Sequence, residues 1–91
     1  MPKIYSNGTA TIVVAANEKI AAFSYSPMQI YQRVGYPNQP NSWDLLIATG
    51  AGDSYLSDAF AAGATIRIDA SASDAFYETG PAPVIGDPTA D

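Results

Sequence analysis

Hydrophobic and polar residues alternate along most of this chain, in short runs separated by turn residues. In Ala64–Ala70, Ile66 and Ile68 face one side of an extended backbone and the polar residues between them face the other. Similar patterns occur in seven further segments: Lys3–Ser6, Thr9–Ala15, Lys19–Ser26, Met28–Tyr36, Trp43–Thr49, Ser54–Phe60 and Ala75–Thr79. About seven to eight short strands at this spacing predict an all-β fold, a small antiparallel β-sandwich or barrel.

Turn and loop residues divide these strands. Pro37–Ser42 contains two prolines and two asparagines, which predicts a loop. Ser57–Ala62 is the one helical candidate, and it is short. Strict alternation in the strand that follows the loop would place three apolar side chains on one face: Trp43, Leu45 and Ile47.

The length predicts a single β-sandwich domain over residues 1–80, followed by an arm at 81–91. The segment Gly80–Asp91 contains three prolines and two glycines, a composition typical of an extended C-terminal arm or tail. Ala10–Val14 resembles Ala64–Ile68 in its sequence pattern, which leaves an internal duplication open.

The chain contains no histidine and no cysteine. This composition excludes Ser–His and Cys–His catalysis, disulfides and cysteine-based zinc sites. We therefore expect no enzyme and no cofactor.

Nine acidic residues against four basic ones give a net charge of −5. The four basic residues are dispersed along the chain, so neither nucleic acid nor an anionic membrane is an expected partner. Apolar runs fall short of the roughly 18 residues of a membrane span, and no export signal is recognised.

Two acidic patterns could carry chemistry. Asp69–Ser73 has the D-x-S-x-S spacing of a magnesium adhesion site, but the same residues commonly cap a strand end. Carboxylate pairs such as Asp53 with Asp58, or Asp74 with Glu78, could hydrolyse glycosides or bind calcium. Scattered acids on a short chain are more simply solvated surface groups, so we predict no catalytic, metal or cofactor-binding residue.

The stretch from Tyr31 to Trp43 combines aromatic, amide and arginine side chains. Such a surface suits protein recognition and could also stack on sugar rings. The simplest interpretation is that Trp43 and one tyrosine anchor the core. The second interpretation is a protein interface, and the third is a carbohydrate-binding site. The predicted interface residues are Tyr31, Arg33, Tyr36, Asn38, Gln39 and Trp43.

A characteristic strand texture and turn placement, without a catalytic signature, occurs in these segments: Glu18–Ala21, Ser24–Pro27, Ile30–Val34, Pro37, Pro40, Trp43–Leu46, Ala59–Ala70 and Phe76–Gly80. Through these segments, most of residues 10–80 resembles a group of small virion-associated proteins of tailed bacteriophages.

This resemblance implies a structural protein of the virion that decorates or cements the capsid. The implied partners are the major capsid protein and further copies of this chain, with a homotrimer favoured. The implied location is the capsid surface, after synthesis in the host cytoplasm. A carbohydrate-binding module of a phage fibre or secreted protein is the alternative, and an enzyme built on carboxylates is a third, weaker hypothesis.

Overall fold

Eight β-strands make up the regular structure of this chain. The computed structural model describes residues 2–36 and 39–84, with side chains at all of these positions except 35–36 and 39–41. The strands are β1 (Lys3–Ile4), β2 (Thr9–Val14), β3 (Lys19–Ser24), β4 (Gln29–Tyr36), β5 (Gln39–Ala48), β6 (Ser54–Leu56), β7 (Ala64–Asp69) and β8 (Ala75–Gly80).

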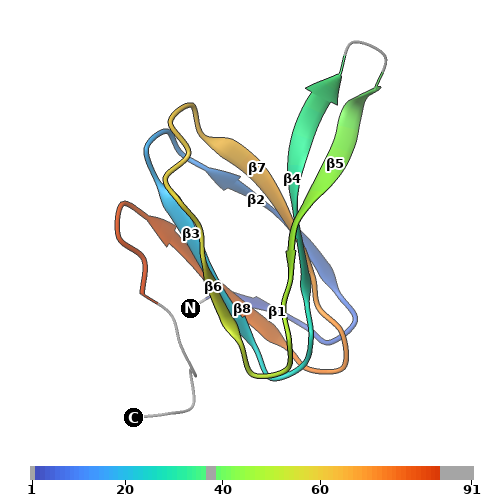
Figure 1. Ribbon diagram of the computed structural model, residues 1–91. Coiled ribbons are helices and arrows are strands. Elements are labelled where there is room, and N and C mark those ends of the chain that lie inside the picture. Colours follow the sequence, from blue (N-terminus) through green and yellow to red (C-terminus); the bar gives the residue numbers. More distant parts are fainter. Residues whose placement is uncertain (1, 37–38, 85–91) are drawn as a thin grey trace.

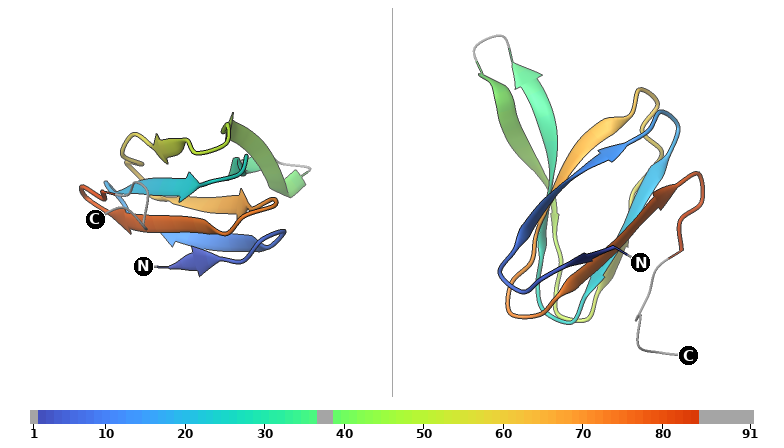
Figure 2. Two further views of the ribbon diagram at one scale, coloured as in Figure 1. Left: turned by 90° about the horizontal axis from the view of Figure 1, so that it is seen from below. Right: turned by 180° about the vertical axis from the view of Figure 1, so that it is seen from behind.

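The strands form two four-stranded antiparallel sheets that pack face to face (Figures 1 and 2). Sheet A has the order β1-β8-β3-β6 and sheet B the order β2-β7-β4-β5. The first strand pairs with the eighth, the second with the seventh, the third with the sixth and the fourth with the fifth. A long antiparallel ribbon wound into two sheets in this way is a jelly roll. The predicted all-β sandwich is therefore confirmed.

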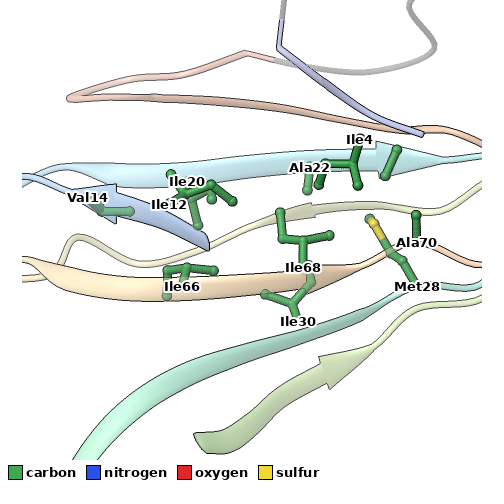
Figure 3. Packing of buried hydrophobic residues seen from close by; sticks show 11 residues of the cluster. Ile4, Ile12, Val14, Ile20, Ala22, Met28, Ile30, Ile66, Ile68 and Ala70 are labelled. Carbon is green, nitrogen blue, oxygen red and sulfur yellow. The ribbon is translucent and has the colours of Figure 1, made fainter. Parts of the chain in front are cut away.

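The core lies between the sheets and is mainly aliphatic (Figure 3). Alternation along each strand supplies it, because every second side chain points inward. Ile66 and Ile68 of β7 are fully buried and pack near Ile30 of β4 and Ile20 of β3. The common face predicted for Ile66 and Ile68 is confirmed as the inward face.

The two segments with similar sequence patterns are partner strands. In the β2–β7 register, Ala10 lies opposite Ile68, Ile12 opposite Ile66 and Val14 opposite Ala64. Both strands line the same core from the same sheet, so they need the same alternation of apolar and polar residues. Their shared environment accounts for the resemblance.

Two local predictions are wrong. Ser57–Ala62 is not helical: Phe60 instead forms an isolated antiparallel bridge with Glu18. The predicted loop Pro37–Ser42 is largely strand, because β4 runs to Tyr36 and β5 begins at Gln39. Pairing with β4 extends the ladder into residues 39–42, which the prolines and asparagines had assigned to the loop. Residues 37–38 lie outside the described part of the chain.

The β4–β5 hairpin extends past the rest of the sandwich (Figures 1 and 2). β7 pairs with β4 only over Gln29–Gln32, whereas β5 pairs with β4 as far as Tyr36. Residues 33–36 and 39–43 therefore form a two-stranded ribbon, here called the overhang. Two strands alone are only marginally stable in water, so the overhang depends on the sheet at its base.

A β-bulge in β5 changes which side chains face the core. Ile30 pairs with Ile47, but the next residue, Tyr31, pairs with Leu45, so Leu46 is an extra residue in β5. Ile47 consequently packs against the core, while Leu45 lies on the opposite face with Trp43. The predicted common face of Trp43, Leu45 and Ile47 is therefore wrong.

The first residues of the expected C-terminal arm pack against sheet A. Pro83 is buried, and with Val84 it lines a depression of about 250 Å³ beside Ala21 and Leu56. The remainder of the arm, residues 85–91, lies outside the described residues. Among those that are described, no helix is both long and apolar enough to span a membrane.

Candidate interaction surface

The outer face of sheet B carries an unusual set of side chains for so acidic a protein. Alternation and register place on it the residues that point away from the core. Two arginines and one aspartate are its only described charged groups; the other members are uncharged. The face comprises Thr9, Thr11, Val13, Gln29, Tyr31, Arg33, Trp43, Leu45, Thr65, Arg67 and Asp69.

At the centre of this face, one arginine contacts two aromatic rings. The guanidinium carbon of Arg67 lies 4.4 Å from the centroid of the Tyr31 ring and 5.2 Å from that of Trp43. Both distances are within the range of cation–π attraction. We call Tyr31, Trp43 and Arg67 the aromatic–arginine cluster. It joins three strands, since Tyr31 lies on β4, Trp43 on β5 and Arg67 on β7.

Asp69 balances the charge of the cluster. Nη2 of Arg67 donates a hydrogen bond of 3.3 Å to Oδ2 of Asp69, and Nε lies 3.3 Å from Oδ1. Nε is buried and makes no hydrogen bond, so its contact with Oδ1 is an ion pair alone. Asp69 also accepts a 2.9 Å hydrogen bond from the Thr9 hydroxyl on β2. These contacts extend the network across all four strands of sheet B.

The network holds its side chains in defined positions. The Tyr31 hydroxyl donates a 2.8 Å hydrogen bond to Oε1 of Gln29 on the same strand. Arginine and aromatic side chains often contribute most to binding at protein interfaces. Side chains that are already ordered lose less entropy on binding, so a prearranged cluster suits a docking surface.

The structure brings together some of the predicted interface residues and leaves others undecided. Tyr31 and Trp43 are half-buried on the outer face, and Arg33 lies opposite Trp43 in the register. Tyr36 and Gln39 pair through their backbones, but their side chains are not described. Asn38 lies outside the described residues.

The core-anchor interpretation of Trp43 is wrong, since Trp43 and Tyr31 lie outside the buried cluster. Tyr55 and Tyr77, on the inward side of sheet A, pack against the core instead. Burial, with a smaller contribution from the Asp58 carboxylate, raises the pKa of the Tyr55 phenol. The face on which an aromatic side chain lies can thus be assigned only when the pairing register of its strand is known.

The sequence alone did not indicate that Arg67 and Asp69 belong to this surface. Their alternation with Ile66 and Ile68 predicted that they face outward, and this is confirmed. Nothing local to Ala64–Asp69 indicated that β7 lies beside β4, where Arg67 faces Tyr31. That pairing joins residues 36 positions apart along the chain.

The acidic patterns have structural roles. Asp69 binds Arg67 and Thr9, and Ser71 donates a hydrogen bond to the Pro27 carbonyl. Asp74 accepts a 2.8 Å hydrogen bond from the Ser6 backbone and forms an ion pair with Lys3. Within residues 2–36 and 39–84, no cluster of three or more acidic groups is placed to hold a metal ion.

Hollows in the described surface are open depressions. One of about 330 Å³ lies between Met28, Thr49 and Ser71 at one end of the sandwich. A second, of about 460 Å³, lies at the opposite ends of β2 and β7, beside Val13 and Gly63. Neither depression includes the aromatic–arginine cluster.

Comparison with known proteins gives no relative for this chain. A scan against protein-family models, a search of curated proteins and a search of solved structures each returned no match. Any functional argument therefore depends on the surface itself.

Proposed function

We propose that this chain is a structural virion protein, a capsid decoration or cement protein that docks through the outer face of sheet B. The observation that carries the proposal is the aromatic–arginine cluster, in which hydrogen bonds, an ion pair and cation–π contacts hold Tyr31, Trp43 and Arg67 in place on the outer face of sheet B. Its partner would be the major capsid protein, and the protein would act as a homo-oligomer, with a trimer favoured. Its location would be the capsid surface.

Two features support this proposal. The described residues of the outer face carry a net charge of +1, from Arg33, Arg67 and Asp69, on a protein of net charge −5, so docking there avoids the acidic groups that dominate the rest of the chain. The overhang, which includes Trp43, reaches beyond the sandwich and enlarges the outer face of sheet B. Jelly rolls also occur among viral capsid domains, which is an analogy of fold and not evidence of function.

The jelly roll equally occurs among lectins, so the alternative of a carbohydrate-binding module needs a separate argument. Sugars commonly stack on exposed aromatic ring faces. Here the Arg67 guanidinium already covers a face of Tyr31 and lies close to Trp43. A sugar would have to use the opposite faces or displace the guanidinium, which favours protein docking over sugar binding.

The first experiment is quantitative mass spectrometry of gradient-purified virus particles from the source lysate. We expect tens to hundreds of copies of this chain per particle, in simple ratio to the major shell protein. Absence from particles would overturn the proposal and give precedence to the sugar-binding alternative, which a glycan titration of Trp43 fluorescence would then test.

A second experiment tests the surface. We expect Trp43→Ala to weaken capsid binding at least tenfold, about the loss that truncating a central interface residue causes. Tyr5→Ala is the control, because Tyr5 is an exposed aromatic residue outside the outer face of sheet B. Equal binding by both variants and the native protein would show that another surface docks.

A further inference from the structure

The two sheets differ in how their edge strands are protected. An edge strand presents unpaired backbone groups, and monomeric proteins usually shorten it or add charges. In sheet A, β1 has two residues and includes Lys3, while β6 has three and lies between Asp53 and Asp58. Both edges of sheet A are therefore poor templates for a further strand.

Sheet B has two long edges, and of these only β2 lacks such protective features. β2 spans six residues, Thr9–Val14, and none of them is charged. β5 spans ten residues and contains one charged residue, Asp44, together with Pro40 and the bulge at Leu46. The whole chain has a net charge of −5, but the two edge strands of sheet B contain a single charged residue. Two copies that meet at these edges therefore repel each other little there.

Exposed apolar side chains mark the same two edges. Val13 of β2 is 78% exposed, Leu45 of β5 is 53% exposed and Leu46 is 36% exposed. Val13 and Leu45 both lie on the outer face of sheet B. If β5 of one copy extended the sheet onto β2 of another, these apolar side chains would lie on the same face of the joined sheet and could contact each other.

The strand directions are compatible with that pairing. Neighbours in the order β2-β7-β4-β5 are antiparallel, so β2 and β5 run in opposite directions within one copy. A second copy placed beside β5 in the same orientation presents its β2 antiparallel to β5. Antiparallel addition continues the ladder that already joins the other strands.

We propose that copies of this chain associate head to tail, with β5 of each copy paired to β2 of the next in a continuous sheet that closes into a ring. This rests on the homo-oligomer of the proposed function. In such a ring the same β5–β2 contact joins every pair of neighbours, so both long edges of every copy are covered. Because the ring closes, no long edge of sheet B stays exposed. A two-fold β5–β5 contact would leave the uncharged β2 open.

The dimensions show why the overhang belongs to this interface. Six paired residues of β2 extend about 20 Å, whereas the ten residues of β5 extend about 33 Å. A stable interface buries about 800 Å² on each partner, more than one pair of short strands provides. The part of β5 that extends beyond the neighbouring β2 supplies additional contact surface on the next copy.

Cross-linking tests the pairing directly, because the native chain has no cysteine. Thr11→Cys and Leu45→Cys place single thiols on the outer faces of β2 and β5. Treated with a short bismaleimide, the mixture of the two variants should give a cross-linked dimer, and either variant alone should not. A dimer from Thr11→Cys alone or Leu45→Cys alone would overturn the head-to-tail arrangement.

Disruption tests the same interface without cross-linking. Native mass spectrometry and light scattering should show a closed oligomer for the native chain and a folded monomer for Val13→Lys, because a lysine on an edge strand blocks strand addition. Leu56→Lys is the matched control: Leu56 is 56% exposed and lies on the edge strand of sheet A. It should leave the oligomer unchanged.

A native chain that is monomeric up to about 1 mM, a range that covers weak association, would overturn the inference. So would an oligomer that Val13→Lys leaves intact. If Val13→Lys fails to fold, the cross-linking result decides alone. A ring that is absent from virus particles would overturn only the proposed function, and a monomer that binds particles would overturn only the ring.

Discussion

Removing the charge of Arg67 tests whether the aromatic–arginine cluster stabilises sheet B. Arg67→Leu keeps part of the aliphatic stem but deletes the guanidinium, and with it the contacts to Tyr31, Trp43 and Asp69. Leucine is preferable to methionine here, because a methionine sulfur would form new favourable contacts with the rings.

The expected loss follows from these contacts. Each cation–π contact at a partly exposed site contributes about 0.5–1 kcal/mol. The Arg67–Asp69 ion pair, with side chains 30% and 29% exposed, adds about 0.2–1 kcal/mol after solvent screening. The variant should therefore lose about 1–3 kcal/mol. A loss of about 2 kcal/mol would lower Tm by about 8–16 °C in a domain of this size.

A double-mutant cycle with Trp43→Leu isolates the cation–π part. Urea unfolding is followed by far-UV circular dichroism, because Trp43 is the only tryptophan and its removal abolishes the tryptophan fluorescence. The Val13→Lys background is used so that self-association does not contribute. We expect a coupling energy of about 0.5–1 kcal/mol between Arg67 and Trp43.

Salt separates the two kinds of contact. In about 1 M NaCl the screening length falls to about 3 Å, so the ion-pair contribution should shrink while the coupling with Trp43 persists. The effects of two independent substitutions add to within about 0.3 kcal/mol. A coupling energy below that value would therefore show that the guanidinium and the indole do not stabilise each other.

Two further predictions concern turns and ionisation. Gly63 has a φ of 77°, and a Cβ there would lie 2.8 Å from the Val14 carbonyl oxygen, so Gly63→Ala should lose about 1–3 kcal/mol in urea unfolding. Gly52→Ala, at φ 75° with no atom within 4 Å, should lose less, and equal losses would argue against the clash. The raised pKa of Tyr55 means that the unfolded phenol ionises first, so stability is retained below about pH 10 and falls as pH rises further. Tyr55→Phe should reduce this alkaline loss in thermal melts and Tyr5→Phe should not, whereas a similar reduction by both would show that burial of Tyr55 is not its cause.

Alternation of apolar and polar residues determined much of the fold. The faces of Ile12, Ile20, Ile30, Ile66 and Ile68 follow from their strand periodicity, and all five side chains are buried. The sandwich follows from the number and spacing of the strands. These features depend on local patterns, which a sequence displays directly.

The extent of the β4–β5 hairpin was not visible in the sequence. Proline and asparagine predicted a loop over residues 37–42, yet only 37–38 separate the two strands. Strand pairing with β4 holds the later residues extended, because a backbone ladder outweighs weak local preferences. The same competition removed the expected helix at Ser57–Ala62, where Phe60 bridges Glu18.

The position of the candidate site was decided by tertiary structure alone. A single extra residue, Leu46, reverses the face of Trp43 relative to Ile47, and no local signal identified that bulge. Arg67 reaches Tyr31 and Trp43 because the jelly-roll order places β7 beside β4. The sequence by itself thus determined the strands and their buried side chains, through interactions between near neighbours. The pairing of distant strands decided which outward side chains meet, since that pairing depends on the packing of the whole core.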